Sequence, residues 1–334
     1  MALHCAIKLG IPNAISRCGG AASLSELHAA LPVAPTKRPC LSRLMRFLAV
    51  SGIFKEDDTN PSQGSDENAG VVRYRLTALS RLLVDDNGGG HACLSPSIAG
   101  CFAPICCMAS LRLAEWLETE DCGAAAAAET PFMMAHGTDV WGMICGDAEM
   151  GAGFNEAMQS DSRFVAGIMV RECREVFAGV RSLVHVGGGD GTMVKAIAKA
   201  FPHVRCSVLE LPQLVDGLQA DDGKVEFVAG DLMEFIPPAD ALLLKFILHD
   251  RSDVDCVTIL KRSMQRSYFC RGTKRKGSVT SKQTLEAQLL MDLMMMVLMT
   301  GKERGEEQWS RMFMEAGFTR YKIDQSHLGD SFTN

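Results

Sequence analysis

A run of glycines directly after an expected strand is the first place where residue types suggest chemistry. The strand is expected over 183–186, the sequence Gly-Gly-Gly-Asp-Gly-Thr occupies 187–192, and a helix is expected over 193–201. Glycine lets a ligand approach the backbone closely, and a helix start offers unpaired amide groups. Alone, the run is ambiguous, because a tight turn between a strand and a helix also needs glycine for steric reasons.

Two acidic residues end the next two expected strands. Glu210 follows the glycines by about 20 residues, where a carboxylate can accept hydrogen bonds from both hydroxyls of an adenosine ribose. Asp231 can accept a hydrogen bond from an adenine amine while Leu232 packs on the ring, although a helix N-cap is the alternative for Asp231. These residues predict a nucleotide-like ligand, and both NAD and S-adenosylmethionine fit them.

A histidine follows the fourth expected strand. That strand is expected over 241–248, and His249 and Asp250 come next. Because parallel strands end at one edge of a sheet, His249 is expected on the same edge as the glycines, where an imidazole can serve as a general base. A structural or merely exposed histidine is the alternative. No metal centre is expected, since no second histidine or cysteine lies at ligand spacing.

The elements that must position these residues follow an α/β pattern. Four short apolar runs alternate with helical segments: 183–186, 206–209, 225–228 and 241–248. This alternation predicts a parallel sheet with helices packed on it. Residues from about 92 to 180 are expected to be helical.

The N-terminal part has short helices followed by a strand. Ser23 and Glu26 have the spacing of a capping box at a helix start. The next helix has apolar residues on one face, at Leu41, Leu44, Met45 and Leu48. Gly52 is placed to end that helix, and a strand expected over 71–76 completes a winged-helix pattern.

Winged-helix modules often bind DNA, so the charges of this part matter. The second helix of the pattern carries basic residues, at Lys37, Arg38, Arg43 and Arg46. An ordinary solvated face is the preferred interpretation. The formal net charge of the whole chain is -6, which does not suit a dedicated polyanion binder. No nucleic-acid partner is expected.

Composition points to a cytoplasmic globular protein. The chain has 334 residues, of which 47% are hydrophobic, and can bury a large core. Its 13 cysteines are scattered without a C-x-x-C pair, which favours reduced thiols. Lys8 interrupts the only candidate for a signal peptide, and Pro96 and Pro104 break the most apolar window. No membrane partner is expected.

Together these motifs resemble the plant phenolic O-methyltransferases of the caffeic-acid type. The matching segments are 1–12, 36–39, 74–77, 130–132, 154–158, 187–192, 201–203, 210–212, 225–232, 236–250 and 301–304. The resemblance implies a winged-helix dimerisation domain over 1–115 and a Rossmann-like S-adenosylmethionine methyltransferase domain over 116–334. It also implies a homodimer and a small hydroxylated aromatic substrate.

The resemblance implies a site for the methyl donor S-adenosylmethionine and no metal. By position, the residues that would contact the donor are Gly187, Gly189, Glu210, Asp231, Leu232 and Lys245. Glu210 stands where the family usually has aspartate, which lengthens the side chain and keeps the acceptor. The substrate-contacting side chains would be Met150, Phe154, Met158 and Phe246. Ordinary core packing is the alternative for each of these four.

Two residues are implied to be catalytic. His249 matches the general base that removes the phenolic proton, so that the oxygen can attack the sulfonium methyl group. Glu303, in the sequence Gly-Lys-Glu-Arg, matches one of two acids that orient this histidine, as carboxylates do in other enzymes that use a histidine base. A solvated charge within a charged run is the alternative for Glu303.

The sequence departs from the family pattern at several places. His185 replaces an acid before the glycines, and the basic segment 263–284 contains no acid where the family has a second acid beside the histidine. A disordered insertion is expected there, without the family's fifth strand. A catalytically impaired paralogue, which only dimerises or binds ligand, is therefore the alternative function. An NAD-dependent oxidoreductase would rest on the glycines and Glu210 alone.

Overall fold

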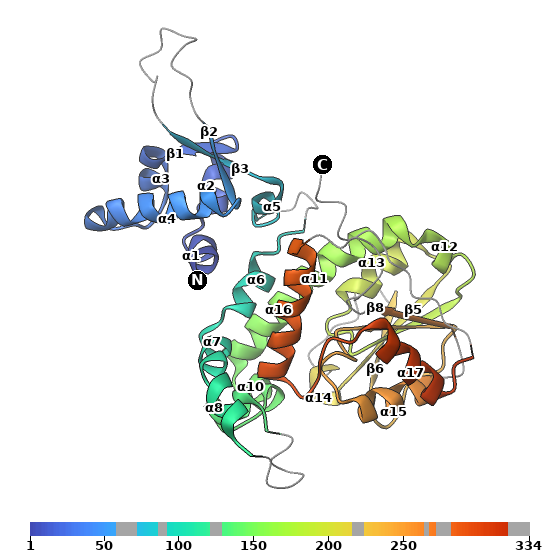
Figure 1. Ribbon diagram of the computed structural model, residues 1–334. Helices are drawn as coiled ribbons and strands as arrows, with labels where there is room; N and C mark the ends of the chain where they lie inside the picture. Colours follow the sequence, from blue (N-terminus) through green and yellow to red (C-terminus); the bar gives the residue numbers. More distant parts are fainter. Residues whose placement is uncertain are drawn as a thin grey trace. The chain divides into compact units, whose positions relative to one another are not determined.

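The chain folds into two compact units, Met1–Phe102 and a larger unit that begins at Ala103 (Figure 1). The computed structural model describes residues 1–57, 72–85, 92–120, 129–215, 224–263, 267–271 and 282–319. The domain boundary at residue 115 expected from the sequence stays a prediction.

The first unit combines short helices with a three-stranded antiparallel sheet of order β1-β3-β2. Its elements are α1 (Ala2–Lys8), α2 (Ile11–Arg17), β1 (Ala21–Ser23), α3 (Leu24–Ala30), a 3-10 helix η1 (Pro35–Lys37), α4 (Arg38–Val50), β2 (Phe54–Asp57), β3 (Arg73–Leu76), α5 (Ala78–Arg81) and α6 (Ser95–Cys101). The expected short helices are confirmed, and β3 lies within the strand expected over 71–76.

Local sequence signals explain the helices of this unit. The hydroxyl of Ser23 accepts a hydrogen bond from the Glu26 amide at 3.2 Å, and the Glu26 carboxylate accepts one from the Ser23 amide at 2.7 Å. This capping box starts α3, as expected. On α4, Leu41, Met45 and Leu48 are buried, which confirms the predicted apolar face.

The second unit contains a helical part followed by a five-stranded parallel sheet of order β6-β5-β4-β7-β8. Its first helices are α7 (Pro104–Leu111), α8 (Leu113–Glu118), α9 (Pro131–His136), α10 (Val140–Gly146), α11 (Ala148–Glu172) and α12 (Arg174–Phe177). The remaining elements are β4 (Ser182–Val186), α13 (Thr192–Ala200), β5 (Arg205–Glu210), α14 (Pro212–Val215), β6 (Val225–Ala229), β7 (Ala241–Lys245), α15 (Asp253–Ser263), β8 (Ser267–Arg271), α16 (Lys282–Leu298) and α17 (Glu306–Ala316).

Helices cover both faces of the parallel sheet (Figure 1). Leu183 and Leu243 pack against α11, α12 and α13, whereas Val184 and Leu242 pack against α15 and α17. Successive strand residues point to opposite faces, so a strand covered on both sides must be apolar throughout. The predicted parallel α/β sheet is therefore confirmed.

Two expectations about the strands are wrong. No fifth strand is expected from the sequence of 263–284, but β8 pairs in parallel with β7, and Ala241 aligns with Ser267. The aromatic pair Tyr268-Phe269 favours a strand, although the surrounding basic residues conceal it in the composition. The run expected as one strand over 241–248 ends at Lys245, because Phe246 adopts a left-handed φ of 57°.

One apolar stretch, Ser95–Glu118, is long and apolar enough to cross a membrane by length and composition, with a mean hydropathy of 1.5. The chain divides it into α6, α7 and α8, and Pro104 stands in the first turn of α7. Within the second unit, Ala109 of α7 is fully buried in a cluster with Phe132 of α9 and Val297 of α16. Only 6% of the most apolar window of this stretch is buried, and the absence of a membrane partner stays a prediction.

We predict that Gly301→Ala destabilises the protein by about 1–3 kcal/mol, the usual cost of forcing extra atoms into a packed region. A Cβ atom at this position would lie 2.0 Å from the His249 carbonyl oxygen and 2.7 Å from the Arg251 nitrogen, which are backbone atoms that cannot turn aside. Urea denaturation measures the change in the free energy of unfolding.

Gly153→Ala on α11 is the matched control. A Cβ atom there meets nothing within 4 Å. Alanine favours helices over glycine, so this variant should gain about 0.5–1 kcal/mol. Equal stabilities of the Gly301→Ala variant and the wild type would show that the two backbone segments are not in contact.

Candidate active site

The strand ends that carry the predicted residues meet at one edge of the parallel sheet. β4 pairs with β5 and β7 in parallel, and Val186 aligns with Leu209 on one side and Leu244 on the other. The next residue along each strand is therefore Gly187, Glu210 or Lys245. The structure thus brings together three positions predicted to contact the donor.

The glycines after β4 form a turn with left-handed backbone conformations, which residues other than glycine rarely adopt. Gly187, Gly189 and Gly191 have φ values of 62°, 57° and 77°. A Cβ atom on Gly187 would lie 2.4 Å from Cδ1 of Ile247. The turn leads directly into α13, whose first amide groups have no partner within the helix. Packing against Ile247 therefore requires glycine at 187, whereas a Cβ atom on Gly189 would meet nothing within 4 Å.

Glu210 joins the glycine turn to the end of β5. Its Oε2 atom accepts a hydrogen bond from the Gly189 amide at 2.9 Å, and Oε1 accepts one from the Leu211 amide at 3.0 Å. Each carboxylate oxygen has two lone pairs, so both can accept a further hydrogen bond from a ligand hydroxyl.

Asp231 lies just after β6, and one of its two carboxylate oxygens accepts a hydrogen bond from the backbone. Its Oδ1 atom accepts a hydrogen bond from the Met233 amide at 2.7 Å, which caps a short turn. The Asp231 side chain is exposed, and Leu232 is partly buried against the core. The capping interpretation and the ligand-binding interpretation are therefore compatible, because Oδ2 is not used by the turn.

A buried ion pair connects Lys245 to α11. Lys245 Nζ lies 2.7 Å from Asp161 Oδ2, and the side chains are only 4% and 17% exposed. The ammonium group also lies 4.0 Å from the centre of the Phe246 ring. Sequence reasoning missed Asp161, since nothing near it in the chain reveals a partner on a distant strand.

His185 lies on the same face of the sheet as Lys245 and is fully enclosed. Burial first, and the charge of Lys245 second, lower its pKa to about 3, so the ring is neutral. Neither ring nitrogen has a hydrogen-bond partner among the described residues. The acid expected from the family pattern is thus replaced by an uncharged group.

His249 and Glu303 form the central contact of the site. His249 Nδ1 lies 2.9 Å from Glu303 Oε1, and the two side chains are 14% and 10% exposed. A carboxylate beside Nδ1 favours the tautomer that is protonated there, which leaves Nε2 as a proton acceptor. Glu303 also has a fixed backbone, because its amide donates to Asp292 Oδ1 of α16 at 2.9 Å.

Phe246 supports the imidazole from the end of β7. The two rings are stacked with centroids 5.1 Å apart and an angle of 13° between their planes. In the described part of the chain, Phe246 is the one non-glycine residue with positive φ, a conformation that costs about 1–3 kcal/mol and is concentrated at functional sites.

The other predicted substrate contacts lie along α11. Met150, Phe154 and Met158 follow one another at intervals of four residues, so they share one face of the helix, and each is partly buried. Phe154 packs edge-on against Trp141 at 5.8 Å between centroids. Asp161, on the next turn of this face, joins the helix to Lys245, beside Phe246.

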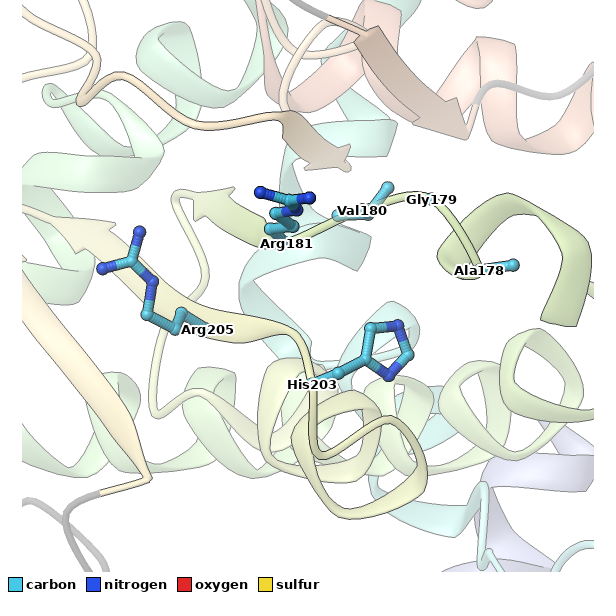
Figure 2. A pocket seen from close by; sticks show the side chains of 6 residues that line it. All are labelled: Ala178, Gly179, Val180, Arg181, His203 and Arg205. Carbon is cyan, nitrogen blue, oxygen red and sulfur yellow. The ribbon is translucent and has the colours of Figure 1, made fainter.

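A separate pocket of about 570 Å³ lies at the opposite edge of the sheet, before β4 and β5 (Figure 2). Arg181, His203 and Arg205 line it with exposed side chains. It contains none of the site residues predicted from the sequence.

Among the residues that the structure describes, no three His, Cys, Asp or Glu side chains gather as a metal-binding group.

The sequence matches an established family over most of its length. The O-methyltransferase domain matches residues 112–319, and the O-methyltransferase dimerisation domain matches residues 1–86. A flavonoid O-methyltransferase-like protein of Oryza sativa subsp. japonica is 43% identical, over 97% of this chain and 87% of its own. Trans-resveratrol di-O-methyltransferase of Vitis vinifera is 39% identical, over 97% of this chain and 88% of its own.

Solved structures share the same fold. Human N-acetylserotonin methyltransferase in complex with SAM superposes with a TM-score of 0.73 at 18% identity, over 98% of this chain and 90% of that one. The mitomycin 7-O-methyltransferase MmcR has a TM-score of 0.63 at 26% identity, over 95% of this chain and 87% of that one. Family match, relatives and fold agree, and the chain therefore belongs to the S-adenosylmethionine-dependent O-methyltransferases, as its motifs indicated.

Proposed function

We propose that this protein transfers a methyl group from S-adenosylmethionine to a hydroxyl of a small phenolic or related aromatic compound, with His249 as the general base. The observation that carries the proposal is the 2.9 Å contact between His249 and Glu303. His249 lies in the loop that follows β7, at the sheet edge that carries the glycine turn, and Glu303 reaches it from the loop between α16 and α17.

The residues of this edge fit the methyl donor. Gly187 and Gly189 let its amino-acid part approach the backbone, Glu210 would accept the ribose hydroxyls, and Asp231 with Leu232 would hold the adenine. Lys245 completes the set predicted from the sequence. When bound, S-adenosylmethionine supplies an electrophilic methyl group on a sulfonium centre.

His249 would accept the phenolic proton through Nε2. A phenol has a pKa near 10 and an imidazole near 6.5, so complete proton transfer before methyl transfer is unfavourable. The arrangement must therefore align the base with the hydroxyl. Glu303 serves this purpose, because its carboxylate orients the ring and stabilises the imidazolium as it forms.

The substrate would lie between Phe246 and the apolar face of α11. A flat aromatic ring suits Met150, Phe154 and Met158, which are apolar and partly buried. The names of the plant relatives, a resveratrol methyltransferase among them, support a phenolic acceptor.

We further propose a homodimer formed through residues 1–86, which match the dimerisation domain, and a cytoplasmic location.

A catalytically impaired paralogue is the alternative. One argument for this alternative is the expected absence of the family's fifth strand, and the presence of β8 contradicts that argument. The absence of an acid in 263–284 remains. Asp250 nevertheless places a second carboxyl group next to His249. Burial raises the pKa of Asp250 to about 6, although the positive charge of Arg251 lowers it, so the carboxyl group is mostly ionised at neutral pH.

We predict that His249→Ala lowers the rate of methyl transfer at least 100-fold, a typical order of magnitude for removing a general base. The affinity for S-adenosylhomocysteine should be unchanged, because His249 is not among the proposed donor contacts. Single-turnover kinetics and calorimetric titration measure the two quantities.

His203→Ala, in the pocket at the opposite edge of the sheet, is the control and should keep wild-type activity. Unchanged methyl transfer by His249→Ala would falsify the mechanism. Robust turnover of any phenol by the wild type would eliminate the impaired alternative.

We predict that Glu210→Ala weakens binding of S-adenosylhomocysteine by roughly 10- to 100-fold, because two charge-assisted hydrogen bonds to the ribose are lost. Glu210→Asp should bind within about 10-fold of the wild type, since it keeps the carboxylate. Calorimetric titration measures both dissociation constants. Wild-type affinity in the alanine variant would remove Glu210 from the donor site.

We predict that Asp250→Asn is about as stable as the wild type at pH 4 and roughly 2–3 kcal/mol more stable at pH 8. The pKa of Asp250 is about 6 in the folded protein and 3.8 otherwise, so the folded state binds more protons between these values. Its contribution to stability is present at low pH and is lost as pH rises through 6. Urea denaturation at several pH values checks this, and a pH-independent difference would contradict it.

A further inference from the structure

Two loops carry the His249–Glu303 pair, and one buried side chain joins them. His249 lies in the loop after β7, and Glu303 lies in the loop between α16 and α17. Arg304 follows Glu303 directly, and its side chain is 0% exposed. A guanidinium so completely removed from water needs strong partners in the protein.

Arg304 donates hydrogen bonds to backbone groups on both sides of His249. Its Nη1 atom donates to the carbonyl oxygen of Leu248 at 2.6 Å, and Nη2 donates to that of Arg251 at 2.7 Å. Its Nε atom donates to Asp253 Oδ1, at the start of α15, at 2.7 Å. The guanidinium therefore spans the turn that presents His249.

Other contacts also join the loop after β7 to the loop between α16 and α17. Lys302 Nζ lies 2.8 Å from Asp253 Oδ2, so this carboxylate binds two cations of the Glu303 loop. Gly301 packs directly on the backbone of His249, as the 2.0 Å distance for an added Cβ shows. The Trp309 ring of α17 lies 5.8 Å from Arg304 Cζ.

Only a guanidinium can make this set of bonds. Arginine presents its donors in a rigid planar fork, whereas lysine has a single nitrogen on a flexible chain. A lysine at 304 would carry all its donors on one nitrogen, which cannot take the positions of the three guanidinium nitrogens that bind these acceptors. The carbonyl groups of Leu248 and Arg251 would no longer be held by the same group.

We propose that Arg304 is a positioning residue for methyl transfer, which fixes the distance between His249 and Glu303 by fastening the two loops to each other. The proposal rests on the proposed function. Arg304 acts through the His249 backbone and its neighbour Glu303. It is not among the residues proposed to contact the donor or the substrate.

The first test is Arg304→Lys, compared with the wild type in single-turnover and steady-state kinetics. The expected result is a kcat about 10- to 100-fold lower, because a misplacement of about 1 Å has this effect on rate. The KM for the phenol and the Kd for S-adenosylhomocysteine should stay within about 2-fold, which places the loss in the transition state. Arg311→Lys, on the exposed surface of α17, is the matched control.

A double-mutant cycle separates positioning from general stabilisation. If Arg304 acts through Glu303, then Arg304→Lys should lower kcat little further in a Glu303→Gln background. Multiplicative effects of the two substitutions would overturn the proposal. If Arg304→Lys does not fold, Asp253→Asn takes its place in the cycle. This variant keeps the guanidinium group, and its effect on kcat should be non-additive with that of Glu303→Gln in the same way.

A measurement without turnover keeps this proposal distinct from the proposed function. In the complex with S-adenosylhomocysteine, the ring Nδ1–H resonance of His249, assigned by its loss in His249→Ala, reports the contact with Glu303. It should shift or broaden in Arg304→Lys and remain in Arg311→Lys. An unchanged resonance would overturn the proposal even if the wild type methylates phenols, and a changed one supports it even if no tested phenol is methylated.

Discussion

The parallel pairing of β4 with β5 and β7 is the constraint on which the site depends. Parallel strands end at one edge, so Gly187, Glu210 and Lys245 become neighbours although long segments separate them in the chain. Helices on both faces bury the sheet and keep its strands in register. The loop after β7 then presents His249 on a rigid support, which its proposed role as a general base requires.

Two ion pairs and one histidine–carboxylate contact join segments that are far apart in sequence. Lys245 meets Asp161 of α11, His249 meets Glu303, and Arg304 meets Asp253. Removing one partner of a buried ion pair lowers the stability of the fold, because the other charge is left buried without a compensating charge. These pairs favour one arrangement of α11 and the two loops over alternatives that would separate the charges.

Features with a local signal were predictable from the sequence. The glycine turn, the capping box at Ser23 and four of the parallel strands depend on neighbouring residues, and the structure has them all. Features set by distant partners were not predictable. Arg304 lies in a charged run, which normally indicates a solvated face, and only the fold reveals acceptors around it. Basic neighbours likewise concealed β8, because composition averages over a window wider than a short strand.

The glycine turn, the proposed base His249 and the apolar face of α11 lie on three different segments of the chain. Residues such as Met150 and Phe154 lie on a helix that contributes neither the glycine turn nor the imidazole. Under the proposed function, inherited changes on that face would alter which compound is accepted and leave the glycine turn and His249 in place. After gene duplication, such a scaffold can diversify the products of a lineage by drift on a single helix, without passing through an inactive ancestor.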